Sequence, residues 1–183
     1  MTALRRINCV ESTAAVLPGY KLRFNIPGIP VVEPSWACVE ECAKADDMVH
    51  GVLYTLTPQD FARVSLSEGV PWGYQWRVVD VVPYTGDGET AGQSAVAASD
   101  ADSSSILQAY TLISNNPFLP RRDIPPSKGY RDLIIRGARE FQMDDEYIKK
   151  LLDTPVGFTV GEGFVAKDVL EAAEDRARRQ NKR

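Results

Sequence analysis

The chain has 183 residues, which favours a single domain large enough to bury a sizeable core. Its formal net charge of −4 argues against a nucleic-acid partner, and no apolar run approaches the roughly 20 residues that a membrane span needs. Three cysteines cannot pair fully, and we expect no secretory leader. We therefore expect a reducing intracellular compartment, the cytoplasm or an organelle interior, without secretion and without a disulfide framework.

The first third of the chain is predicted to be mostly strand. Pro18-Gly19 marks a turn between two apolar runs, whereas the proline- and glycine-rich stretch 26–34 is typical of an irregular loop. In chain order we expect a short helix over 3–7, strands over 14–17 and 20–24, the loop 26–34, and strands over 36–42 and 51–56.

A helix is predicted to begin at Thr57-Pro58. The threonine hydroxyl can cap the helix, proline suits the first helical position, and Asp60 lies in the first turn, where the helix dipole favours an acid. Glu68 follows the end of this helix in the segment Ser67-Glu68-Gly69-Val70-Pro71. One acidic residue is therefore expected on a glycine-containing turn that leads into an aromatic-rich strand.

Two strands and a composition break follow. The valine pairs within 74–83 are too continuous for a half-exposed edge, so we expect a buried strand there and a returning strand over 106–113. Between them, 85–105 consists mainly of alanine, serine, glycine and aspartate, which predicts a flexible surface loop that adds little to the core. Four prolines favour an irregular loop over 114–126.

The strongest helical pattern in the chain starts at Tyr130. Apolar and small residues recur at helical spacing and predict a face buried against a sheet, with a glycine–alanine pair that allows close approach. That face comprises Tyr130, Leu133, Ile134, Gly137, Ala138 and Phe141. A further helix is expected over 144–150. We thus predict one domain over 1–165, with 85–105 as a flexible inserted loop, followed by a charged C-terminal helix within 166–183.

Most other polar side chains favour structural roles. Cys38 and Cys42 have the spacing Cys-x3-Cys, but a structural zinc site needs a second pair of ligands and His50 is the only histidine. We therefore expect buried free thiols and no metal site. The single histidine also disfavours Ser-His-Asp and Cys-His catalysis. The basic cluster within 176–183 is better interpreted as a solvated helix end than as a contact for an acidic partner.

Glu68 is the candidate for acid/base chemistry. Tyrosines at 74, 110 and 130 each begin or end an apolar run, and a carboxylate walled in by aromatic rings can serve as a base or an acid near neutral pH. A Glu-Gly turn is more often an exposed acid, however, and aromatic residues are more often part of the core. The residues by themselves therefore predict a small α+β domain with a candidate acid/base carboxylate.

Four segments, taken in order, resemble the γ-glutamylcyclotransferase-like family. They are His50-Gly51-Val52-Leu53-Tyr54-Thr55-Leu56, Ser67-Glu68-Gly69-Val70, Ala109-Tyr110-Thr111-Leu112, and Pro125-Pro126-Ser127-Lys128-Gly129-Tyr130 followed by Gly137-Ala138. Their order and spacing agree with the family over roughly 16–152, except for 85–105, which looks inserted.

The resemblance implies an α+β fold, namely a small mixed β-barrel with packed helices. It also implies cyclisation of a γ-glutamyl compound to 5-oxoproline, with release of the attached amine and without a cofactor. On this reading Glu68 is the general acid/base, and Tyr74, Tyr110 and Tyr130 contact the substrate. Gln75 replaces Tyr74 if the register shifts by one residue.

The sequence departs from the family at one motif. The family's first strand ends in a Tyr-Gly-Ser-Asn loop whose backbone amides bind the γ-glutamyl group, and the sequence has no such segment. Three explanations stay open: a naturally shortened chain, a start at an internal methionine, or a sequence that is part of a longer polypeptide. If the strand is lost, we expect the barrel to open and to expose a sheet edge, which a second copy of the chain or another protein would cover.

Three hypotheses about function follow. The first is a γ-glutamylcyclotransferase, and the second is a catalytically inactive family member that acts as a structural or binding subunit of a larger complex. The third is a small-molecule-binding domain outside the family, which uses the same aromatic pocket without turnover.

Overall fold

The computed structural model describes residues 7–42, 47–85, 89–99 and 103–160. The helix predicted within 166–183 lies outside these ranges, as does most of the helix predicted over 3–7. In chain order the elements are β1 (Cys9–Pro18), β2 (Tyr20–Ile29), β3 (Glu33–Glu41), β4 (Met48–Leu56), α2 (Pro58–Ser67), β5 (Tyr74–Pro83), α3 (Ala91–Ser99), the 3-10 turn η1 (Ser103–Ser105), β6 (Leu107–Ser114), α4 (Lys128–Glu140) and α5 (Asp145–Leu152).

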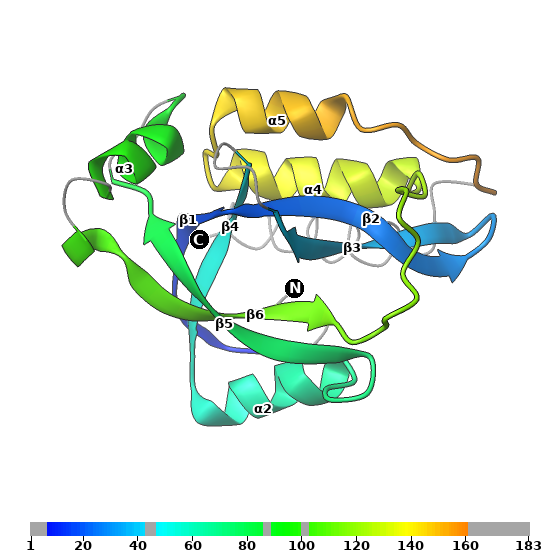
Figure 1. The fold of residues 1–183 in the computed structure, drawn as a ribbon, viewed down its shortest axis with the longest axis horizontal. Helices are drawn as coiled ribbons and strands as arrows, with labels where there is room; N and C mark the ends of the chain where they lie inside the picture. Colours follow the sequence, from blue (N-terminus) through cyan, green and yellow to red (C-terminus); the bar gives the residue numbers. More distant parts are fainter. Residues whose placement is uncertain (1–6, 43–46, 86–88, 100–102, 161–183) are drawn as a thin grey trace, which may run out of the picture.

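The described strands form two sheets, one of four strands in the order β4-β1-β5-β6 and one of the two strands β2 and β3. Helices α4 and α5 stack together on one side of the strands, and α2 lies on the opposite side (Figure 1). The α+β class is confirmed. The described sheets do not close into a barrel, in agreement with the opened form of the prediction, whereas the predicted mixture of parallel and antiparallel pairing is wrong for them, because every pairing is antiparallel.

The hairpin of β2 and β3 occupies most of the stretch predicted to be an irregular loop. Pro27 pairs with Ser35 and Ile29 with Glu33, and a proline is tolerated here because β2 is an edge strand. At Gly28 an added Cβ would lie 2.1 Å from the carbonyl oxygen of Glu33. Glycine therefore allows the two strands to approach closely at this turn.

Helix α4 packs against the core beneath α5 (Figure 1). Ala138 is buried, and Ile134 and Phe141 pack against the core, as the periodicity predicts. Ile135 lies outside the predicted face and is nevertheless 4% exposed. An added Cβ at Gly137 would meet nothing within 4 Å, so the close approach predicted there is wrong. Contacts on two sides, from the strands and from α5, explain why the buried face differs from the predicted one.

Part of the predicted flexible loop 85–105 is instead the helix α3. Ala95 is 1% exposed, and the Asp144 carboxylate accepts hydrogen bonds from the backbone N–H groups of Gly92 (2.8 Å) and Gln93 (2.9 Å). Alanine has a high helix propensity, and its small side chain permits close packing. The segment therefore contributes to the core without containing a large apolar residue.

Candidate active site

Glu68 lies at the C-terminal end of α2. Its backbone N–H donates to the Val64 carbonyl oxygen at 3.0 Å, and its side chain is half-buried. Gly69 follows with a φ of +67°, a left-handed conformation that glycine adopts readily. The chain thereby turns at once from the helix toward β5, which begins at Tyr74.

The structure brings Glu68 together with Tyr74 and Tyr130. Burial raises the pKa of Tyr74 to about 12, and the nearby charges of Glu68 and Tyr130 add to this effect. Burial also raises the pKa of Tyr130, and the negative charges of Glu33 and Glu68 contribute. Glu68 therefore lies within electrostatic reach of both tyrosines, a group called the Glu68 cluster below, and both phenols stay protonated at neutral pH.

Tyr130 is held in a defined orientation. Its hydroxyl oxygen accepts a hydrogen bond from the backbone N–H of Ala37 at 3.2 Å. Its ring meets Trp36 and Phe24 edge to face, with centroid separations of 5.4 and 6.2 Å. Since the oxygen already accepts from the backbone, the hydroxyl proton remains available for donation to a bound substrate.

A buried carboxylate supports the segment that carries Tyr130. Glu33 is 1% exposed and accepts hydrogen bonds from the backbone N–H of Ser127 (2.9 Å) and from its hydroxyl (2.5 Å). The Ser127 hydroxyl in turn caps α4 by accepting from the Tyr130 N–H at 3.0 Å. Sequence reasoning missed Glu33, because its partner lies 94 residues away and no local pattern indicates the contact.

Tyr110 lies elsewhere. It is 62% exposed, and its ring centroid is 5.5 Å from that of Phe61 and 6.3 Å from that of Trp76. The structure thus groups three of the four predicted site residues and places Tyr110 in an aromatic cluster on the α2 side of β5 and β6.

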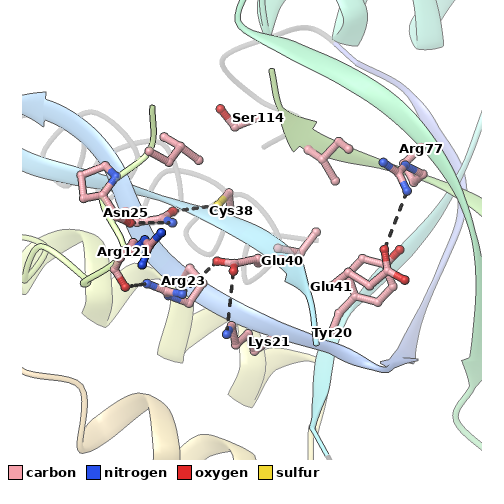
Figure 2. Close-up of a pocket in the computed structure, with 14 residues that line it drawn as sticks. Tyr20, Lys21, Arg23, Asn25, Cys38, Glu40, Glu41, Arg77, Ser114 and Arg121 are labelled. Atoms are coloured by element: carbon pink, nitrogen blue, oxygen red, sulfur yellow. Dashed lines mark hydrogen bonds and ion pairs between the residues drawn. The ribbon is translucent and has the colours of Figure 1, made fainter. Parts of the chain in front are cut away.

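A cavity of about 570 Å³ lies between the two sheets (Figure 2). Residues of β2 and β3 line one side of it, and residues of β5, β6 and the loop after β6 line the other. Cys38 lines this cavity, and burial raises the pKa of its thiol to about 11. Ser114 also lines the cavity and is the register partner of Tyr74 in the β5–β6 pairing, so the cavity adjoins the Glu68 cluster.

The described residues contain no group of three or more histidine, cysteine, aspartate or glutamate side chains that is arranged to hold a metal ion. None of the described helices is both long enough and apolar enough to cross a membrane.

The sequence is similar to fungal proteins named gamma-glutamyl cyclotransferase. No family model matches the chain. Gamma-glutamyl cyclotransferase gliK of Claviceps purpurea (strain 20.1) is 30% identical over 156 residues, which cover 83% of this chain and 63% of that protein. The gliK protein of Aspergillus fumigatus is 28% identical over 151 residues, which cover 74% of this chain and 50% of that protein. The chain thus spans between half and two thirds of the length of these relatives.

Solved structures share the fold. A gamma-glutamyl cyclotransferase structure superposes with a TM-score of 0.65 at 19% identity and covers 87% of this chain and 83% of its own. An uncharacterized human protein gives the same TM-score and identity, with coverages of 88% and 86%. Fold and site together define an α+β domain with a carboxylate–tyrosine cluster beside a cavity. The chain belongs to the γ-glutamylcyclotransferase-like family.

Proposed function

We propose that the protein cyclises a γ-glutamyl compound to 5-oxoproline and releases the attached amine, with Glu68 as general acid and base. The observation that carries this proposal is the cluster of Glu68 with Tyr74 and Tyr130 in a member of this family. A half-buried carboxylate beside two protonated phenols can exchange a proton while neutral donors orient the substrate.

The chemistry needs one proton carrier. Glu68 takes a proton from the substrate's neutral α-amine as the amine nitrogen attacks the γ-carbonyl carbon to close a five-membered ring. The bond from that carbon to the leaving nitrogen breaks, and Glu68 returns the proton to the leaving amine. Because the attack is intramolecular, a site that holds the reactive rotamer supplies much of the rate.

The tetrahedral intermediate carries a negative oxygen that needs hydrogen-bond donors. The Tyr130 hydroxyl suits this role, since its oxygen is fixed by Ala37 and its raised pKa keeps the proton in place. Tyr74 offers a second phenol beside it. On this proposal the two tyrosines contribute hydrogen-bond donors to that oxygen.

The test is release of 5-oxoproline from γ-glutamyl amino acids by the protein and its Glu68→Gln variant. Glutamine keeps the shape and removes the proton carrier, so turnover should fall by at least about 100-fold while binding persists. The matched control is Asp80→Asn, which neutralises an exposed carboxylate on the strand that carries Tyr74 and should leave turnover unchanged. Turnover that does not depend on Glu68 would overturn the mechanism.

The second candidate is a non-catalytic binding or structural subunit, which would use the same pocket of Glu68, Tyr74 and Tyr130 without turnover. Its signature would be binding of γ-glutamyl compounds, measured by calorimetry, with no 5-oxoproline release from several of them. The same hypothesis places a second copy of the chain or another protein on an open sheet edge. Light scattering at several protein concentrations would detect the homodimer.

A further inference from the structure

Strand β3 holds the segment 124–130, which leads into α4 and carries Tyr130, at three points. The side chains of Glu33 and Ser35 lie two residues apart and therefore on the same face of the strand. The three contacts are Glu33 with Ser127, the Ser35 hydroxyl with the Ile124 carbonyl oxygen at 2.6 Å, and the Ala37 N–H with the Tyr130 hydroxyl at 3.2 Å.

These contacts fix both ends of Tyr130. At the backbone end, Glu33 binds Ser127, whose hydroxyl accepts from the Tyr130 N–H at 3.0 Å. At the other end, the N–H of Ala37 on the same strand binds the phenol oxygen. A shift of β3 relative to α4 would therefore move the Tyr130 hydroxyl relative to Glu68.

The charge of Glu33 also acts on Tyr130. Removing a carboxylate from water costs free energy, which Ser127 offsets by donating twice. Burial is the largest cause of the raised pKa of Tyr130, and the negative charge of Glu33 adds to it, because a phenolate would be repelled. Glu33 therefore helps to hold the phenol in the protonated form, which is the form that donates to an oxyanion.

We propose that Glu33 and Ser35 are positioning residues for the reaction, and that they hold the segment 124–130 so that the Tyr130 hydroxyl meets the oxyanion of the intermediate. The inference rests on the proposed function and adds to it how the fold places one of the donors. Glu33 is 1% exposed, Ser35 is fully buried, and neither lines the cavity, so neither touches the substrate. Their loss should therefore lower kcat and leave KM nearly unchanged, since an oxyanion donor acts in the transition state.

Two variants and a matched control test the assignment. Glu33→Gln keeps the shape but removes the charge and the acceptor for the Ser127 hydroxyl. Ser35→Ala removes the second contact. Asp144→Asn is the control, because Asp144 is also a carboxylate with 1% exposure that accepts two hydrogen bonds, but it receives them from the start of α3. Circular dichroism at the assay temperature verifies that each variant is folded.

We expect kcat for 5-oxoproline release to fall about tenfold or more in Glu33→Gln, by less in Ser35→Ala, and not in Asp144→Asn. In a Tyr130→Phe background, Glu33→Gln should lower kcat by less than about twofold, because its effect passes through the hydroxyl already removed. Additive losses of kcat, or equal losses in Glu33→Gln and Asp144→Asn, would overturn the inference while the proposed function stood. If Glu33→Gln does not fold, Ser35→Ala must lose kcat in the same Tyr130-dependent way, and an additive loss would overturn the inference.

A titration of Tyr130 tests the positioning without turnover. Carbon NMR of tyrosines labelled at Cζ follows each phenol, and the signal missing from Tyr130→Phe identifies Tyr130. Glu33→Gln should lower the pKa of Tyr130 and shift its signal, whereas Asp144→Asn should change neither. If even the unmodified protein releases no 5-oxoproline, the proposed function fails and this titration decides the positioning alone. An unchanged signal and pKa of Tyr130 in Glu33→Gln would overturn it.

Discussion

Replacing Ser127 with alanine should destabilise the protein more than the loss of an ordinary helix cap. Ser127 is fully buried, caps α4 through the Tyr130 N–H, and donates its hydroxyl to Glu33. Loss of the cap costs about 0.5–2 kcal/mol. A buried carboxylate oxygen that loses its donor costs about 1–3 kcal/mol more. The free energy of unfolding should therefore fall by about 1.5–5 kcal/mol.

Thr57→Ala is the comparison: Thr57 also caps α2 and donates its hydroxyl to the Asp60 carboxylate at 2.8 Å, but Asp60 keeps its ion pair with Arg63, so the loss should stay near the cap cost of about 0.5–2 kcal/mol. Urea unfolding followed by far-UV circular dichroism gives both values, with unchanged slopes as the check on two-state behaviour. A double-mutant cycle with Glu33→Gln should give a coupling energy above about 1 kcal/mol. Equal losses for Ser127→Ala and Thr57→Ala, together with negligible coupling, would refute the reasoning.

Two further predictions concern the α3 region and pH. Gly92→Ala should lower the melting temperature, because the new Cβ would lie 2.6 Å from the Tyr84 ring, whose hydroxyl is held by His50. Gly137→Ala, in open space within helix α4, should instead raise the free energy of unfolding by about 0.5–1 kcal/mol. Similar effects of the two changes would contradict this packing. Burial lowers the pKa of His50 in the folded protein, so as the pH falls the unfolded chain binds a proton at this imidazole before the folded chain does. The free energy of unfolding should therefore fall as pH drops below about 6.5. Urea unfolding at pH 7.5 and 5.5 should show a smaller loss for His50→Gln than for the unmodified protein, and equal losses would refute the assignment.

Elements with strong local signals were predictable from the sequence. The Thr57-Pro58 start of α2 is confirmed, with the threonine hydroxyl accepting from the Asp60 N–H, and the strand over 74–83 has the predicted bounds. These features depend on capping, on the fixed φ of proline and on runs of β-branched residues, all of which act between near neighbours. The proximity of Glu68 and Tyr74 could be expected from the sequence for the same reason, since one short turn joins them.

Features that depend on distant contacts were not predictable. Glu33 belongs to a stretch that resembles a loop until Ser127 is placed against it. Ala91 and Ala95 of α3 are buried, and the helix is held there by contacts of Gly92 with Asp144 and Tyr84. The position of Tyr110 depends on the register of β5 and β6, in which Tyr110 pairs with Val78 and Tyr74 pairs with Ser114. Four residues along a strand correspond to about 13 Å, which explains why Tyr110 lies apart from the cluster.

The cavity follows from the charge pattern of the strands that border it. Lys21 pairs with Glu40 across β2 and β3, and Arg77 faces them from β5. Charged groups cannot be enclosed in a dry interface without a large desolvation cost, so the two sheets remain separated by a solvent-accessible space. Farther along the same face of β5, Val79 and Val81 are buried in the core shared with α4 and α5. One face of β5 therefore contributes Arg77 to the charged cavity at one end and Val79 and Val81 to the apolar core at the other, so the cavity begins where this face leaves the core.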